Sequence, residues 1–532
     1  MTEASIAREA PLDLASGSAA PSLRQSRLAV LLFIALLAAA AVPVFSVRIP
    51  ALIDFANHLG RLHTMAVLGQ DPYLTRFYSV HWKIIPNLGV DILLPIFIRH
   101  MSVYLVGKLF VFACMALWLS GAFAIHAALW RRIGLGPLVA FLFVYNFIFF
   151  YGFLNYLLGA GLALWGIAAW IALRRSHPLL RGLVSFVFVL VLFACHLFAL
   201  GVYGLAVLAH EAWRLRTAPA GGRRLGGDVA AFALPFLIVP ALLLASPTAG
   251  YSLDVKWTAE AKFFGLFYII KNFNNPLDLA IGLGLAAAAL LAWRRRVLLV
   301  HPLGWYLLAV SVPVYLAMPD VLFGSWAADR RLPIAIFFVL IGMTRWELSA
   351  PAARAAFVAV VVGVALLRFA VVDYYWRWFD HLYAQVEDSF RDIAPGSRIL
   401  VGQIESPELR YTFRHFLFHA PCLAMIERSS MVPTAFTHPG KQILHVNRAY
   451  LQFSDVNETP LPVQRRLVAE ARHPDPDPPA GEYWAGWPQK FDYLYIMYQP
   501  RPENPLPDLL TPLYQGDEFS LYKIERKPQP IE

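Results

Sequence analysis

Long apolar runs are the feature that most constrains how this chain can fold. They recur from Leu28 onward with few or no charged residues, and an α-helix needs roughly 20 apolar residues to cross a hydrocarbon core of about 30 Å. Of the 532 residues, 58% are hydrophobic and only 15% are charged, which is far from the balance of an ordinary soluble domain. The sequence therefore predicts an α-helical polytopic membrane protein.

Short arginine clusters separate the runs and indicate the topology. The clusters are Arg131–Arg132, Arg174–Arg181, Arg214–Arg224, Arg294–Arg296 and Arg345–Arg354. Placing each cluster in the cytoplasm predicts about eleven spans, with the N-terminus inside and the C-terminus outside. These spans lie near residues 28–46, 103–129, 135–150, 156–173, 182–196, 198–213, 228–246, 278–293, 298–317, 333–345 and 355–373. Because the basic residues are spread between the runs, the net charge of +10 does not indicate a nucleic-acid partner.

Two segments leave the number of spans open between about ten and twelve. Residues 182–213 must hold two short crossings with a turn near His196, which we interpret as an ordinary interfacial residue. Residues 85–98 are apolar but contain two prolines and Asp91, so we expect an interfacial or re-entrant helix.

Composition divides the chain into three parts. Residues 1–27 are rich in alanine and serine and predict a disordered cytoplasmic tail. Residues 28–378 predict the transmembrane domain, with a large first outer loop at residues 47–102. Residues 379–532 carry more proline and charge and predict an outer, periplasmic α/β domain. Its expected strands are 398–401, 423–427, 493–498 and 519–524, with a helix at 465–472.

The first outer loop carries a polar stretch next to the membrane. In a helix, Asp54, His58 and Arg61 would follow one another at intervals of four and three residues and share one face. An acid, an imidazole and a guanidinium on one face suit proton transfer or phosphate chemistry. The alternative is a solvated juxtamembrane helix whose charges lie among lipid headgroups.

The sequence resembles the GT-C superfamily of integral-membrane glycosyltransferases, in particular bacterial members that use polyprenyl-phosphate sugars. The similar stretches are DFANHLGR at residue 54, DPYLTRFYSVHWKIIPNLGVD at residue 71, GFLNYLLGAGLAL at residue 152, FDYLYIMYQP at residue 491 and LYQGDEFSLYKIE at residue 513. The resemblance implies a bacterial inner-membrane enzyme that moves a sugar from a lipid-linked donor to an outer-face lipid, polysaccharide or protein. Family members often have a pair of acids where this chain has Asp54 followed by Phe55, which leaves open whether Asp54 acts with a distant acid.

Within that resemblance, the chemistry assigns roles to particular residues. Transfer to a hydroxyl needs a base, here Asp54 with His58 beside it, and positive charge to stabilise the departing phosphate. Arg330 and Arg331 are the predicted phosphate ligands, because arginine binds phosphate through two N–H groups and these two lie on the outer side. The alternative for this pair is an ion pair with Asp329 or Asp320, or contact with lipid headgroups. Weaker candidates for substrate binding are Arg61 and Asp91.

Other features predict no further chemistry. His415, His419, His438 and His445 lack metal-ligand spacing and read as ordinary histidines; no metal site is predicted, although a divalent cation is not excluded. The three cysteines define no disulfide framework, and no nucleotide-binding loop is present in the sequence. Two other functions remain open: a transporter or flippase of lipid-linked sugars, and a non-catalytic membrane scaffold with an outer binding domain.

Overall fold

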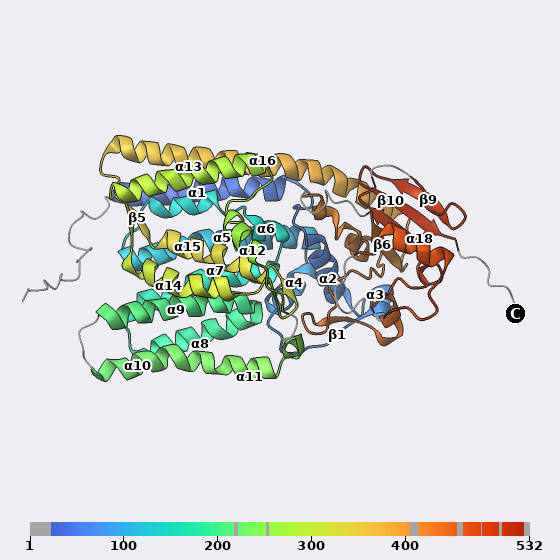
Figure 1. The fold of residues 1–532 in the computed structure, drawn as a ribbon, viewed down its shortest axis with the longest axis horizontal. Helices are drawn as coiled ribbons and strands as arrows, with labels where there is room; N and C mark the ends of the chain where they lie inside the picture. Colours follow the sequence, from blue (N-terminus) through green and yellow to red (C-terminus); the bar gives the residue numbers. More distant parts are fainter. Residues whose placement is uncertain are drawn as a thin grey trace, which may run out of the picture.

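A computed structural model describes residues 23–217, 222–251, 255–404, 413–454, 461–479, 481–499 and 503–525. The chain forms a long helical bundle with a small domain containing a β-sheet at one end (Figure 1). The bundle helices are α1 (Leu23–Ser46), α5 (Val103–Trp130), α7 (Leu154–Ala172), α8 (Pro178–Cys195), α9 (Leu197–Thr217), α10 (Gly222–Ala233), α11 (Ile238–Leu244), α13 (Asn275–Arg294), α14 (Pro302–Ala317), α15 (Ala328–Gly342) and α16 (Pro351–Ser389).

Seven helices within the described ranges are long and apolar enough to cross a membrane. They are Gln25–Ser46, Val103–Trp130, Leu154–Arg175, Pro178–Cys195, Gly226–Leu244, Asn275–Arg294 and Pro351–Asp392. Large apolar side chains on their outer faces are open, for example Leu31 at 64%, Leu183 at 58% and Leu283 at 63%. Exposed apolar side chains on several long apolar helices need lipid to cover them, so the protein is a polytopic membrane protein. The predicted total of eleven spans is not confirmed.

One predicted span is wrong. Residues 135–150 form a 3-10 helix (Gly136–Leu142), a bend and the short helix α6 (Phe147–Tyr151) instead of one continuous helix. Nearly every side chain of this segment is buried against other helices. Irregular backbone at membrane depth is tolerated when protein surrounds it, and hydropathy does not distinguish such a segment from a lipid-facing span.

The start of the chain differs slightly from its prediction. The first helix begins at Leu23, within the segment predicted as a disordered tail, and the rest of that tail (residues 1–22) lies outside the described residues. The turn predicted near His196 is confirmed, because α8 ends at Cys195 and α9 begins at Leu197.

Arginines gather at the end of the bundle that lies away from the sheet domain. Arg132 and Arg345 both pair with Glu347, beside the strand pair β2 (Leu298–Val300) and β5 (Thr344–Trp346). Figure 1 shows β5 at this far end. Two of the basic clusters, those of Arg132 and Arg345, therefore lie at the same end of the bundle.

A network of buried charges joins three helices near the same end. Arg181 on α8 contacts Glu211 on α9 at 2.8 Å and Asp228 on α10 at 2.5 Å. Arg214 contacts the same two acids at 2.9 and 2.8 Å. Two arginines therefore balance two carboxylates, which lets these charges remain among apolar helices.

Helix α16 connects the bundle to the sheet domain, for which we keep the name outer domain from the sequence prediction. Its 39 residues correspond to about 58 Å, well beyond a hydrocarbon core of about 30 Å. It passes through residue 378, the predicted domain boundary, without a break and ends at Ser389. Figure 1 shows it running along the bundle and into the outer domain.

The outer domain is built on a four-stranded sheet of order β6-β8-β10-β9. Its strands are β6 (Ile399–Gln403), β8 (Tyr493–Met497), β9 (Leu510–Gln515) and β10 (Phe519–Ile524), with β6 and β8 parallel. The strands expected at 398–401, 493–498 and 519–524 are confirmed, as is the helix at 465–472, here α18 (Gln464–Arg472). A short helix, α19 (Trp487–Lys490), precedes β8.

Two local predictions in this domain fail. Residues 423–427, expected as a strand, form a helical turn and α17 (Ala424–Glu427); a short apolar run does not separate the two states. Strand β9, which contains Pro512, was not predicted. Proline is tolerated there because β9 lies at the edge of the sheet.

The first outer loop lies between the bundle and the outer domain. It contains α2 (Phe55–Val67), α3 (Pro72–Phe77), β1 (Tyr78–Val80) and α4 (Gly89–Ile98). Strand β1 pairs antiparallel with β7 (Leu444–Val446) of the outer domain. Two further short elements, helix α12 (Ala259–Phe267) and the hairpin of β3 (Val321–Leu322) and β4 (Ser325–Trp326), belong to later loops.

The contact between α2 and the outer domain depends on Gly60. A Cβ at this position would lie 2.7 Å from the backbone oxygen of Cys422 and 3.2 Å from the sulfur of Met425. We expect Gly60→Ala to lower stability by about 1–3 kcal/mol, because a rigid backbone must move. Thermal unfolding of the purified protein measures this. Gly69→Ala is not a suitable control because its φ is positive, so we choose Gly201→Ala, where nothing lies within 4 Å.

Candidate functional site

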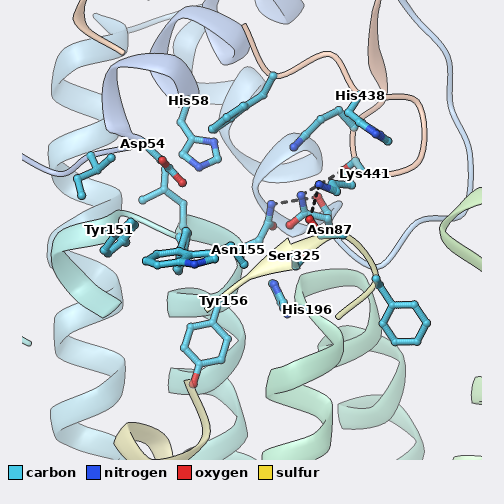
Figure 2. Close-up of a pocket in the computed structure, with 18 of the residues that line it drawn as sticks. Asp54, His58, Asn87, Tyr151, Asn155, Tyr156, His196, Ser325, His438 and Lys441 are labelled. Carbon is cyan, nitrogen blue, oxygen red and sulfur yellow. Dashed lines mark hydrogen bonds between the residues drawn. The ribbon is translucent and has the colours of Figure 1, made fainter. Parts of the chain in front are cut away.

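A cavity of about 1010 Å³ lies where the bundle, the first outer loop and the outer domain meet (Figure 2). The bundle contributes the segment before and at the start of α7, the turn at His196 and Arg331 of α15. The first outer loop contributes Asp54, His58 and Asn87, and the β3–β4 hairpin contributes Trp326. The outer domain supplies the remaining wall, mainly residues 415–419 and 433–442.

The charged groups of this cavity are few. Asp54 is the one carboxylate among the described residues that line it, and Arg331 and Lys441 are its cations. Five imidazoles surround them, those of His58, His196, His415, His419 and His438. In Figure 2, Asp54 and His58 lie on one side of the view, and His438 and Lys441 lie on the other.

Asp54 stands immediately before α2, and the helix is arranged as the sequence predicts. The backbone N–H of His58 donates to the carbonyl of Asp54 at 3.0 Å, so the two side chains are one turn apart on one face. The Asp54 carboxylate does not cap the helix. Its backbone N–H donates to the carbonyl of Tyr151 at 3.0 Å, which ties the residue to the bundle. The Asp54 carboxylate lines the cavity and forms no hydrogen bond that caps the helix.

Arg61, predicted as a ligand for substrate or lipid phosphate, lies outside the cavity. It forms an ion pair of 2.6 Å with Asp91 on α4, and both side chains are 0% exposed. Another nitrogen of the same guanidinium lies 3.4 Å from Nδ1 of His58. Neither Arg61 nor Asp91 can reach a ligand in the cavity without breaking this pair. In the structure, Arg61 and Asp91 form a contact between α2 and α4, and Arg61 also lies against His58.

The two arginines of the ADRRLP sequence point to different places. Arg331 lines the cavity; its guanidinium lies 3.0 Å from Nε2 of His196 and donates to the Trp326 carbonyl at 3.1 Å. Arg330 is not among the cavity-lining residues, and its guanidinium lies 4.6 Å from the ring centre of Trp326. Trp326 thus stands between the cavity and Arg330.

Neither Asp329 nor Asp320 forms the ion pair with Arg330 or Arg331 that the sequence left open. Asp329 pairs with Lys262 of α12 at 2.8 Å, and no acid among the described residues lies within ion-pairing distance of either Arg330 or Arg331. The guanidinium of Arg331 instead lies 4.2 Å from the ring centre of Phe153, as a cation over an aromatic face. A buried cation without an acid partner is suited to an anionic ligand.

His419 is one of four cavity-lining histidines that the sequence analysis interpreted as ordinary residues, together with His196, His415 and His438. It lies just after a short 3-10 helix (Phe413–Leu417), and its Nε2 is 3.7 Å from Oδ1 of Asp54. Asn57, one helical turn before Arg61, reaches its Nδ1 at 3.0 Å. Phe436 packs edge-on against both His419 and His58. No local pattern signals this group, because its partners come from opposite ends of the chain.

Burial keeps both histidines neutral at pH 7. Removal from water lowers the pKa of His419 to about 3, and burial together with the charge of Arg61 lowers the pKa of His58 well below its ordinary value. Both rings can therefore accept or donate hydrogen bonds in the cavity without adding positive charge beside Asp54.

The lowered pKa of His419 predicts that the folded protein loses stability in acid. An unfolded chain binds a proton at His419 near pH 6.5, whereas the folded one binds it only near pH 3, so this contribution to stability is complete above pH 6.5 and is lost as the pH falls. Lowering the pH from 6.5 to 5 should cost the wild type about 2 kcal/mol more than His419→Gln, at about 1.4 kcal/mol per pH unit. Thermal unfolding of both proteins at each pH gives the difference. If the stability of the wild type and that of His419→Gln fall equally as the pH is lowered, the prediction is wrong.

Comparison with known proteins adds no assignment. No family model matches the chain, and no curated protein is similar to it. Within the described ranges, no group of three or more His, Cys, Asp or Glu side chains is arranged to hold a metal ion.

Proposed function

We propose that the protein is a membrane glycosyltransferase of GT-C type that moves a sugar from a polyprenyl phosphate to an acceptor hydroxyl. The observation that carries this proposal is that one carboxylate, Asp54, and one guanidinium, Arg331, which has no ion-pair partner within 4 Å among the described residues, line the same cavity. A base and an anion-binding group in one site are the two functions that this transfer requires.

The proposed reaction is a single displacement. The acceptor oxygen attacks the anomeric carbon of the sugar while the bond from that carbon to the phosphate oxygen breaks. The acceptor proton passes to Asp54, and the leaving phosphate keeps the electron pair and is stabilised by Arg331. The phosphate leaving group needs no strong acid, which agrees with the single carboxylate among the described lining residues.

The two walls of the cavity suit two different substrates. On the bundle side, Phe153, Tyr156 and Phe198 lie around Arg331, which suits the phosphate end of a lipid-linked donor. On the outer-domain side, polar groups such as Gln403, His438 and Lys441 suit a hydroxyl-rich acceptor. A volume of about 1010 Å³ is at the upper end of the usual range of about 300–1,000 Å³ for small-molecule sites, which leaves room for both.

The proposed location is the bacterial inner membrane, with the N-terminus in the cytoplasm and the outer domain in the periplasm. The arginines at the end away from the cavity support this orientation, because positively charged loops remain on the cytoplasmic side. The acceptor is then a lipid, polysaccharide or protein of the cell envelope.

Deletion of the gene in its host tests the proposal. Mass spectrometry of envelope glycolipids, polysaccharides and glycoproteins should show one sugar missing, and the wild-type gene should restore it. An unchanged glycan profile in the deletion strain, with the protein shown to be expressed in the parent, would contradict the proposed function. In that case a transporter that moves lipid-linked sugars, or a binding scaffold, would be the better explanation.

A further inference from the structure

His419 of the outer domain lies close to Asp54. The two atoms concerned, Nε2 of His419 and Oδ1 of Asp54, are 3.7 Å apart, and both side chains are largely buried. His419 is 8% exposed and Asp54 is 15% exposed. The pair therefore forms where two parts of the fold meet, in a cavity with restricted access for water.

The surrounding hydrogen bonds fix how Asn57 is oriented. The backbone N–H of Phe436 lies 2.8 Å from one end of the Asn57 amide, and a backbone N–H can only donate, so that end is the oxygen. The carbonyl of Thr434 lies 2.8 Å from the other end and can only accept, so that end is the nitrogen. The second hydrogen of the same nitrogen is directed at Nδ1 of His419, 3.0 Å away.

This orientation determines which nitrogen of His419 carries the proton. Because Asn57 donates to Nδ1, Nδ1 must accept and carries no hydrogen. The ring is then neutral with its hydrogen on Nε2, the nitrogen that faces Asp54. Burial also favours the neutral ring, since it lowers the pKa of His419 to about 3.

We propose that His419 is a positioning residue for Asp54: its Nε2–H, fixed by Asn57, is directed at the carboxylate and orients it toward the acceptor. Its catalytic consequence rests on the proposed function, whereas the tautomer and the contact do not. The separation of 3.7 Å is longer than a hydrogen bond, and such bonds often tighten only when substrate binds. Members of the superfamily that the sequence resembles often have two acids at this place, whereas here an imidazole from the outer domain lies beside Asp54.

Nitrogen NMR of the full-length protein in detergent micelles tests the contact directly. Histidines carry the 15N label, and the His419 signals are those that disappear in His419→Gln. In the wild type we expect a proton on Nε2 and none on Nδ1 from pH 5 to 8. Asp54→Asn should shift the Nε2–H signal, and Asn57→Asp should move the proton to Nδ1 because the new carboxylate accepts there. A wild-type ring protonated on Nδ1, or one unaffected by Asp54→Asn, would overturn the proposal.

Activity tests whether the contact matters for transfer. In the complemented deletion strain, His419→Ala should lower the amount of restored sugar by about 10- to 100-fold, the range expected when a reacting group is misplaced. His419→Gln should recover part of it, because a glutamine amide supplies an N–H near the position of Nε2. His445→Gln is the matched control, since His445 stacks on His81 outside the cavity-lining set and should restore the sugar fully.

The NMR and activity experiments together distinguish failure of the proposed function from failure of the proposed Asp54–His419 contact. Each variant is compared at equal membrane abundance and thermal midpoint, so that unfolding is not mistaken for lost positioning. Equal restoration by His419→Ala and wild type would overturn the catalytic part even if the NMR signals are as expected. If deletion removes no sugar but the NMR signals agree, the proposed function fails while the Asp54–His419 contact stands.

Discussion

Asp54→Asn is expected to abolish sugar transfer while leaving the protein folded. Asparagine has nearly the same shape but cannot accept the acceptor proton, and a positioned general base contributes about 10²–10⁴-fold to rate. Within the described lining of the cavity no second carboxylate could take its place. The carboxylate does not cap α2, so its loss should not shorten the helix. The measurement is the amount of restored sugar in the complemented deletion strain, with an expected loss of at least about 100-fold.

The control for this variant is another aspartate of the same loop. Asp71 begins α3 and accepts from the backbone N–H groups of Tyr73 and Leu74, both at 2.9 Å, outside the cavity-lining set. Asparagine also serves well at that position, so Asp71→Asn should restore the sugar fully. Full restoration by Asp54→Asn at the same expression level would show that Asp54 is not the base.

The parts of the fold that follow from local sequence were predictable. Hydropathy locates α1, α5 and α7 to within a few residues, because a lipid-crossing helix must be apolar along its whole length. The placement of Asp54 and His58 on one helical face follows from the four-residue spacing alone. In both cases the determining interactions lie within one turn or one segment.

The sequence predictions that were wrong concern features that depend on contacts between distant segments. The segment at residues 135–150 has the hydropathy of a span, yet it is surrounded by other helices, and only the tertiary structure decides between the two. His419 has no local signal, since its role comes from Asn57 and Asp54 far earlier in the chain. Arg61 lies on the same helix as His58 but is paired with Asp91 of another helix, which sequence spacing did not reveal.

Breaking the Arg61–Asp91 pair should have the largest effect on stability. Both side chains are 0% exposed and their closest atoms are 2.6 Å apart, so removing one leaves the other charge buried without its partner. Such losses cost about 3–5 kcal/mol, and we expect Asp91→Leu and Arg61→Met each to fall in this range. Thermal or denaturant unfolding of each purified variant in the same detergent provides the measurement.

The double variant Arg61→Met with Asp91→Leu separates the charge from the packing. Because no charge is then left unpaired, it should be more stable than either single variant and close to wild type. Arg61 also lies 3.4 Å from Nδ1 of His58, so the double variant should lose this contact and restore less sugar than its stability alone would allow. If the effects of the two single substitutions simply add in the double variant, the two residues are not coupled and the buried pair does not hold α2 against α4.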